Sequence, residues 1–207
     1  DVELVDRLED KMKLIELCLT MAYDYKVNYT DVYSQVRCWD TLIYNHLKSK
    51  HIVIPPREDH DKAAQFEGAY VKDPDLGLHK WIVSFDLNSL YPHLIMQYNI
   101  SPETYVGVET KGMSVENMLN QQLNLDWAKK KNVAISANGA MFRRDKQGFL
   151  PELMEKMYGD RVIYKKKMME AKKEFQKTKD PIYKNEIARC HNIQMAKKIS
   201  LNSAYGA

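Results

Sequence analysis

The stretch of residues 81–104, with the sequence WIVSFDLNSLYPHLIMQYNISPET, constrains the fold most strongly. β-Branched and aromatic residues alternate over 81–85, a pattern that predicts a strand packed on at least one face. The strand would deliver Asp86 at its end. Pro92 follows, and proline is tolerated in the first turn of a helix because that turn has no intrahelical use for its N–H group. We therefore predict a strand, a carboxylate, a tight bend and a short helix over 93–98.

Asp86 has two interpretations on these residues alone. An aspartate that follows a strand commonly caps a helix or stabilises a turn. Burying a carboxylate without a partner costs free energy, whereas a bound divalent metal ion would make the carboxylate useful. Both interpretations stay open at this point.

The composition is that of an ordinary globular chain. Its 207 residues are 44% hydrophobic and 29% charged, which permits one core or two small ones. Cys18, Cys38 and Cys190 show no metal-binding spacing and cannot pair evenly, so we expect a reducing, cytoplasmic environment. No apolar run approaches the ~18 residues of a membrane span, so no membrane partner is expected. The chain starts at Asp1 without a methionine and stops at Ala207 inside a helical pattern, which suggests a fragment of a longer polypeptide.

Helical periodicity dominates both ends of the chain. Apolar residues at helical spacing predict one long helix over residues 1–25, and Thr30 and Asp31 offer an N-cap for a second helix. Pro151 opens a long helix near its start. Asp180 precedes a proline that breaks this helix and begins another, so the two should form an antiparallel hairpin.

The middle of the chain alternates short strand and turn patterns. We predict strands over 105–108 and 133–135, helical structure over 114–131 and a turn at 138–139. The tract 145–148 indicates a further hairpin connection, with Gly148 at a position of positive φ. The whole pattern predicts an α+β fold.

The long helix carries the main concentration of charge. Residues 161–179 contain eight basic residues against two acids, Glu170 and Glu174, while the whole chain has a net charge of only +3. A run of this kind suits a polyanion such as a triphosphate or a nucleic acid, although a solvated helix face is its commoner meaning. Arg161 and Lys165 lie one turn apart beside the apolar stripe of the helix, where both cations could overhang a cleft.

Two separated tracts resemble the polymerase motifs of family B DNA polymerases. Residues 86–92, DLNSLYP, resemble the first motif, and the following NISPET of 99–104 resembles its version in T-even bacteriophages. Residues 197–206, KKISLNSAYG, resemble the second motif, which lies on the fingers. Three weaker resemblances are to the connector of the phage enzymes at 37–41 and 54–56, and to a template-contacting element at 66–71, in which Phe66 stands where the family has tyrosine.

This resemblance implies a partial polymerase palm sheet with flanking helices and an antiparallel helical fingers hairpin. Residues 1–65 would be connector helices that follow an exonuclease domain, residues 66–149 the palm portion with the first motif, and residues 150–207 the fingers. Asp1 falls where the last metal-binding aspartate of the exonuclease would lie, but a helix-initiating aspartate is an equal or better interpretation.

The resemblance also implies a function, namely template-directed nucleotide transfer by a two-metal mechanism. Asp86 would be the catalytic residue and would bind Mg²⁺ together with the carbonyl of Leu87. The residues that would bind the nucleotide are Leu87, Ser89, Leu90, Tyr91, Arg161, Lys165, Lys198 and Asn202. The residues that would lie near the base pair or template are Gly68, Tyr205 and Gly206. The ring of Tyr91 would lie under the deoxyribose and reject a 2′-hydroxyl.

The partners implied by the resemblance are primer–template DNA, a dNTP, a second polypeptide with the rest of palm and thumb, and a sliding clamp. The family's second aspartate motif and its thumb do not occur in the sequence, so we expect this chain to be inactive alone. The alternative is a non-catalytic nucleic-acid-binding helical module, in which the basic helix tracks phosphates. That alternative leaves the tract around Asp86 without a purpose.

Overall fold

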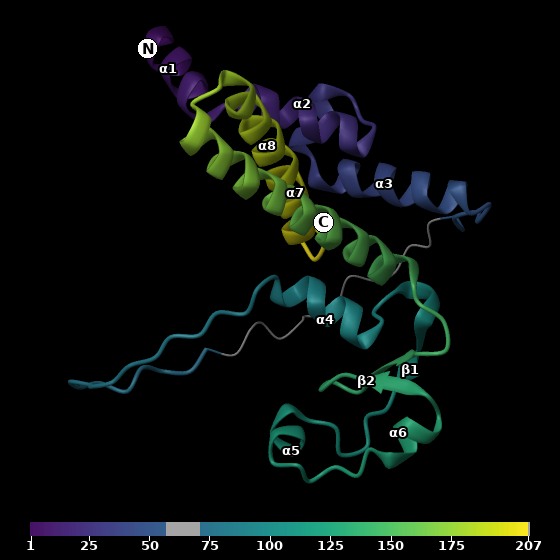
Figure 1. Cartoon of the computed structure of the whole chain (residues 1–207). Coiled ribbons are helices and arrows are strands. Elements are labelled where there is room, and N and C mark those ends of the chain that lie inside the picture. The colour runs from purple at the N-terminus through teal and green to yellow at the C-terminus, as the bar shows by residue number, and fades with distance from the viewer. Residues whose placement is uncertain (57–70, 207) are drawn as a thin grey trace.

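The computed structural model describes residues 1–56 and 71–206, and its fold is α+β, as expected. Figure 1 shows a helical part, formed by α1, α2, α3, α7 and α8, above a smaller part that holds a three-stranded sheet. Helix α4 lies between the two parts, beneath the long helix α7. Residues 66–70 of the predicted template-contacting element, Gly68 among them, lie outside the described residues.

The N-terminal region forms two helices where the sequence predicts one. Helix α1 covers Val2–Met12 and helix α2 covers Leu14–Tyr25, because Lys13 adopts a left-handed conformation with φ 52°. The carboxylate of Glu9 accepts hydrogen bonds from the N–H groups of Leu14 and Ile15, so it caps the second helix and stabilises the break.

The next helix begins later than predicted. A 3₁₀ helix, η1, covers Tyr29–Tyr33, and helix α3 covers Gln35–Ser49. Its N-cap is Ser34, whose hydroxyl accepts from the N–H of Arg37, rather than Thr30 or Asp31. The apolar side chains of Val32, Trp39 and Leu47 in this region are buried.

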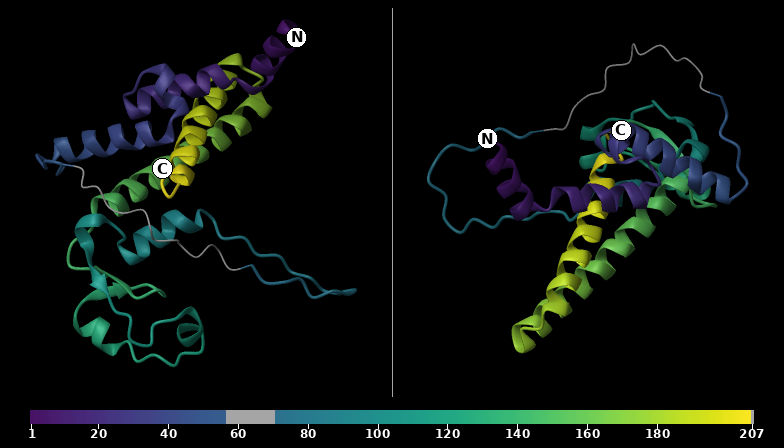
Figure 2. Two further views of the ribbon diagram at one scale, coloured as in Figure 1. Left: turned by 180° about the vertical axis from the view of Figure 1, so that it is seen from behind. Right: turned by 90° about the horizontal axis from the view of Figure 1, so that it is seen from above.

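The predicted helical hairpin is confirmed. Helix α7 covers Phe149–Thr178 and helix α8 covers Pro181–Ser203, and Figure 2 shows the two running side by side to a common tip. The carboxylate of Asp180 caps α8 by accepting from the N–H of Ile182. The apolar stripe of α7 packs in the core at Leu153, Met157 and Met168.

One group of buried side chains joins α3, α4, α7 and the end of α8. Its buried members are Trp39, Ile95, Leu153, Met154, Met157 and Leu201. Helix α4, Leu90–Tyr98, includes the predicted short helix and contributes Ile95 to this group. The packing holds α4 against the first turns of α7.

The sheet has the strand order β1-β3-β2, and both pairings are antiparallel. The bounds are Tyr105–Val108 for β1, Val133–Ile135 for β2 and Ala140–Arg143 for β3. Gly139 turns the chain between β2 and β3 with φ 85°, as predicted, and a Cβ there would meet the carbonyl oxygen of Glu109 at 1.9 Å. The region predicted as helical over 114–131 contains two short helices, α5 at Val115–Leu119 and α6 at Asp126–Lys130.

Two predictions in this part of the chain are wrong. Residues 81–85 form no strand, and residues 71–88 extend away from the body (Figures 1 and 2) with Trp81 97% exposed and Phe85 90% exposed. A strand needs a hydrogen-bonded neighbour, and none of the described residues pairs with this segment. Gly148 has φ −73° and is the N-cap of α7, so the tract 145–148 enters a helix instead of a second hairpin.

Candidate functional site

The start of α4 is the first component of the candidate site. Ser89 has a left-handed backbone with φ 52° and is the N-cap of the helix. The N–H groups of the first turn point out of a helix start, where they and the helix dipole favour an anion. Leu90 and Tyr91 lie in this turn, and their side chains are exposed. Asp86 and Leu87 precede it in the extended segment.

Arg161 of α7 reaches the start of α4. Its Nη1 donates to the Oγ of Ser89 at 3.2 Å. The Nε of Arg161 is buried and has no hydrogen-bond partner within residues 1–56 and 71–206. The packing of His93 against Tyr158, with ring centroids 4.7 Å apart, holds the two helices together near this contact. The guanidinium therefore lies at the helix start with part of its donor capacity unused.

Tyr91 and Tyr205 form the third component. Their rings stack with centroids 4.1 Å apart and an interplanar angle of 20°. Tyr205 follows the last turn of α8, and the indole Nε1 of Trp39 donates to the Oγ of Ser203 at 3.0 Å, which fixes that turn. Both tyrosines are about half exposed, at 46% and 52%, so one edge of the stack faces solvent.

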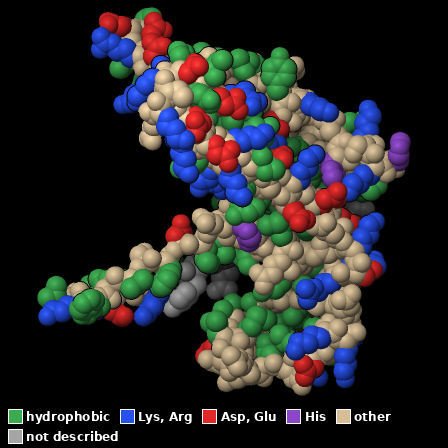
Figure 3. Space-filling model, in the orientation of Figure 1, with side chains coloured by type: hydrophobic (Ala, Val, Ile, Leu, Met, Phe, Trp, Pro, Cys, Tyr) green, Lys and Arg blue, Asp and Glu red, His purple; other side chains and the backbone are tan. Residues whose placement is uncertain are grey.

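The structure thus brings together four of the predicted residues, Ser89, Tyr91, Arg161 and Tyr205. Lys165, Lys198 and Asn202 lie exposed on α7 and α8, and their side chains make no hydrogen bond or ion pair to other described residues. Gly206 is exposed beside Tyr205. Figure 3 shows Lys and Arg side chains along the visible face of the helical hairpin.

Asp86 does not form a metal site with the described residues. Its side chain is exposed, and the part of the chain that the structure describes contains no group of three or more His, Cys, Asp or Glu side chains able to hold a metal ion. Mg²⁺ requires near-octahedral oxygen coordination and is held by one or two carboxylates with waters and phosphates. The carboxylate of Asp86 and the carbonyl of Leu87 would supply only part of such a coordination shell, and phosphates, waters or other carboxylates would supply the rest.

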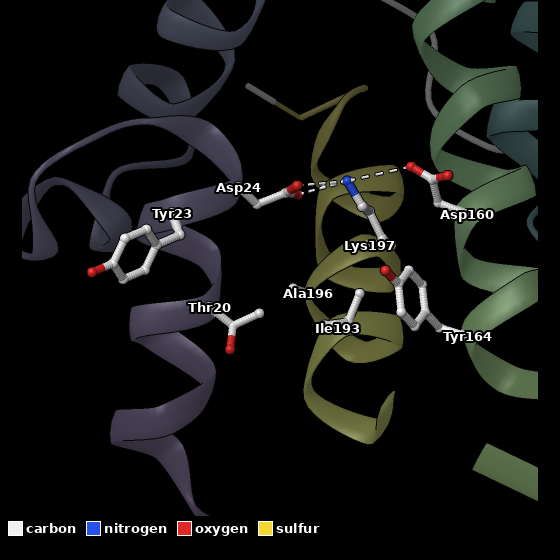
Figure 4. Close-up of a pocket in the computed structure, with 8 residues that line it drawn as sticks. All are labelled: Thr20, Tyr23, Asp24, Asp160, Tyr164, Ile193, Ala196 and Lys197. Carbon is white, nitrogen blue, oxygen red and sulfur yellow. Dashed lines mark hydrogen bonds and ion pairs between the residues drawn. The ribbon is translucent and has the colours of Figure 1, made fainter. Parts of the chain in front are cut away.

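Sequence reasoning missed the role of Lys197, which lies next to the predicted Lys198. Its Nζ lies 2.6 and 2.9 Å from the carboxylate oxygens of Asp24 on α2, and 3.8 Å from Asp160 on α7. The three side chains line a cavity of about 350 Å³ between α2, α7 and α8 (Figure 4). The Lys197 side chain is only 12% exposed. No local sequence signal marks it, because its partners come from distant segments.

The chain belongs to DNA polymerase family B, whose family model matches residues 27–207. Among its relatives, it is 33% identical over 184 residues to the DNA-directed DNA polymerase of Escherichia phage RB69, covering 88% of this chain and 20% of that protein. It is 36% identical over 169 residues to the DNA-directed DNA polymerase of Enterobacteria phage T4, covering 81% of this chain and 18% of that protein. The resemblance to the T-even phage members is confirmed.

A solved structure shows the same fold. The family B DNA polymerase from the archaeon Pyrobaculum calidifontis aligns with a TM-score of 0.63 at 23% identity, over 96% of this chain and 23% of that chain. The chain spans about a fifth of the length of the curated phage relatives it matches. None of the helices in the described residues is long and apolar enough to cross a membrane.

Proposed function

We propose that this chain supplies the nucleotide-binding face of a template-directed DNA polymerase. The observation that carries the proposal is the meeting of the α4 helix start, Arg161 and the Tyr91–Tyr205 stack at one place. Membership of family B supports it, because two of the tracts that form this place, 86–92 and 197–206, resemble the two motifs of that family.

The phosphates of an incoming dNTP would lie between α4 and the helical hairpin. The α4 helix start offers N–H donors, and Arg161 offers a guanidinium that is already placed there. Lys165, Lys198 and Asn202 would add further contacts from the exposed faces of α7 and α8, where no ion pair competes for them among the described residues. A triphosphate in this position would neutralise the local excess of basic side chains.

The sugar and base would lie on the tyrosine stack. The ring of Tyr91 is a flat, rigid surface supported from one side by Tyr205. A deoxyribose resting on its exposed edge would leave no room for a 2′-hydroxyl, so Tyr91 would discriminate against ribonucleotides. Tyr205 and Gly206 would border the new base pair, and Gly68 would contact the template.

Catalysis would require more than the described residues. Asp86 is the candidate catalytic carboxylate and Mg²⁺ ligand, and Leu87 offers its carbonyl, but these two do not complete a metal site. We therefore propose that the two-metal chemistry of the family belongs to a complete polymerase, in which other segments supply the remaining carboxylates. Primer–template DNA and a dNTP would be its substrates. The partners of this chain would be a sliding clamp and a second polypeptide that carries the rest of the polymerase. The assembly would work in the cytoplasm of the cell.

The domain organisation follows the same proposal. Residues 1–65 would be the connector, with α1, α2 and α3; residues 66–149 the palm portion, with α4 and the sheet; and residues 150–207 the fingers, with α7 and α8.

Primer extension tests this function. The chain would be assayed alone and after co-expression with a polypeptide that carries the parts of a family B polymerase that this chain does not span. We expect extension only in the mixture, and loss of extension with Asp86→Asn. Extension that survives Asp86→Asn would contradict the catalytic assignment. DNA binding by the chain without any extension in the mixture would instead favour the non-catalytic binding module.

The Tyr91→Ala substitution tests whether Tyr91 discriminates against ribonucleotides. It is assayed in the co-expressed mixture that extends primers, called the active mixture below. We expect ribonucleotide insertion to rise relative to deoxyribonucleotide insertion, and unchanged discrimination would contradict this role of Tyr91.

A further inference from the structure

The start of α7 is held by side chains of another segment. The first N–H groups of a helix have no intrahelical acceptor. Here the N–H of Gly148 donates to Oδ1 of Asn99 at 2.9 Å and the N–H of Phe149 donates to Oε1 of Glu103 at 2.6 Å. Leu150 donates at 3.4 Å to the hydroxyl of Ser101. Pro151 has no N–H group, so each of these helix-start donors is satisfied by the segment 99–103.

Asn99 has the most contacts in this arrangement. Its Nδ2 donates to the carbonyls of Arg143 at 2.6 Å and Lys146 at 2.9 Å, while its Oδ1 accepts from Gly148. The residue is 8% exposed, and its φ of 57° lies in the left-handed region that asparagine tolerates better than most residues. A single buried amide therefore joins the end of α4, the end of β3 and the start of α7.

A second contact joins the same two helices at the other end of α4. Asn99 ends α4 beside Gly148, and Ser89 begins α4 beside Arg161, so α4 and α7 run antiparallel and are connected at both ends of α4. Arg161 lies about 20 Å along α7 from Gly148 at 1.5 Å per residue. Because α7 is one continuous helix, a shift or tilt of its start would move Arg161 away from Ser89.

We propose that Asn99 is a positioning residue that sets the place of Arg161 over the start of α4. Asn99 acts through the helix, since its side chain points at the α7 start and not at the candidate nucleotide site. The positioning itself is independent of the proposed function. Its consequence, that Asn99 controls affinity for the nucleotide triphosphate, rests on that function.

The side-chain Nε–Hε signal of Arg161 in the ¹⁵N-labelled chain tests the positioning. Arg161→Lys assigns the signal by deleting it. In the native chain we expect slow exchange of this hydrogen with solvent, because the Nε is buried. Asn99→Gly keeps a residue suited to the left-handed backbone but removes the amide. We expect it to accelerate the Arg161 exchange at least tenfold.

Two references separate positioning from a general loss of stability. The indole Nε1–H of Trp39, which is bonded to Ser203, reports the core in the same spectrum. Loss of global stability would accelerate both signals, whereas loss of positioning would accelerate Arg161 alone. The matched control is Asn132→Gly, because Asn132 is exposed, also has a left-handed backbone, with φ 52°, and makes no side-chain hydrogen bond to the described residues.

Asn99→Asp is the second variant, for the case in which Asn99→Gly fails to fold. It keeps the shape and the acceptor for Gly148 but places an anion against two carbonyls, and we expect the same selective effect on Arg161. A folded Asn99 variant with Arg161 exchange equal to that of the native chain would overturn the proposal, as would equal acceleration of the Arg161 and Trp39 signals.

In the active mixture, the Asn99 variants should raise the KM for dNTP at least threefold with kcat little changed. If the exchange responds but KM does not, the positioning stands and the nucleotide role of Arg161 is refuted.

Discussion

Lys197 and Lys198 are adjacent on α8 but have different surroundings. Lys197 is largely buried and is paired with Asp24 and Asp160, whereas Lys198 is exposed. Lys197→Met would leave two carboxylates facing each other without their cation. Because Asp24 and Asp160 keep 25% and 36% exposure, we expect a loss in the free energy of unfolding of about 1–3 kcal/mol.

Urea unfolding of the two variants checks this prediction. Lys198→Met should change the free energy of unfolding by less than about 0.5 kcal/mol, as for other exposed positions. In the active mixture it should raise the KM for dNTP. Equal stability of the two variants would show that the Lys197 pairs contribute nothing measurable.

Tyr25 makes the stability of the chain depend on pH in the alkaline range. The side chain is 1% exposed and its hydroxyl lies 2.5 Å from Oγ of Ser200, which donates to the carbonyl of Ala196. With the Ser200 hydroxyl donating to Ala196, we assign Tyr25 as the donor of this hydrogen bond, a role that its phenolate could not fill. Burial raises the pKa of Tyr25 from 10.0 to about 12.

The direction in which the free energy of unfolding changes with pH follows from this raised pKa. Tyr25 stabilises the fold fully below pH 10, and the contribution is lost as the pH rises from 10 through about 12. We expect Tyr25→Phe to reduce the free energy of unfolding by about 1 kcal/mol at neutral pH. The difference between the native chain and the variant should shrink above pH 10 in urea unfolding followed by circular dichroism. A difference that stays constant to pH 12 would contradict the assignment.

At the scale of elements, the junction between 99–104 and α7 explains why Gly148 is a glycine. A Cβ there would lie 2.5 Å from the Cβ of Ser101 and 3.1 Å from Cγ2 of Thr104. Gly148→Ala should therefore lower the free energy of unfolding by about 1–3 kcal/mol, although its φ of −73° suits alanine.

Gly159, in the interior of the same helix, is the matched control for this prediction. A Cβ there would meet nothing within 4 Å. Gly159→Ala should raise the free energy of unfolding by about 0.5–1 kcal/mol through helix propensity. Thermal unfolding of both variants compares them directly. If both substitutions stabilise the chain, the close approach at Gly148 is not a constraint.

The elements differ in how far the sequence predicts them. The α7–α8 hairpin follows from apolar periodicity and the Asp180-Pro181 break, which are local signals. The role of Gly148 does not follow from local signals. A glycine can indicate either a positive φ or a close contact, and the contact with Ser101 comes from a distant segment. The break at Lys13 depends on a cap from Glu9 that periodicity does not reveal. The strand pattern at 81–85 describes residues suited to a sheet, but a strand also needs a neighbour.

The residues of the candidate site also divide into those with a local sequence signal and those placed by contacts between distant segments. Ser89, Tyr91, Arg161 and Tyr205 could be predicted because they lie in motifs or on a basic helix face. The pairing of Lys197 with Asp24 and the bonds from Asn99 to the α7 start could not, because each joins segments distant in the sequence. Asp86 is marked by its motif, yet the described residues do not complete its metal site.

The whole molecule exposes far more surface than its mass requires. Its accessible surface is 16390 Å², whereas a compact monomer of 24.2 kDa would expose about 10,000 Å². The extended segment 71–88 contributes strongly to this excess, with Leu76, Leu78 and Trp81 each more than 90% exposed. Apolar side chains in a pattern typical of a strand, with no hydrogen-bonded neighbour among residues 1–56 and 71–206, suit a surface that another polypeptide segment covers.

Trp81 allows this idea to be tested on the intact chain. We expect that the polypeptide supplying the rest of a family B polymerase buries Trp81 when the two associate, because the strand pattern at 81–85 would then gain a hydrogen-bonded neighbour. In the chain labelled with 5-fluorotryptophan, the ¹⁹F signal of Trp81, assigned by Trp81→Phe, should change with H₂O/D₂O exchange in the free state. It should lose that dependence in the mixture. Trp39, at 4% exposure, is the internal reference and should be insensitive in both states. A mixture that extends primers while Trp81 keeps its solvent dependence would show that the segment 81–85 stays uncovered in the active polymerase.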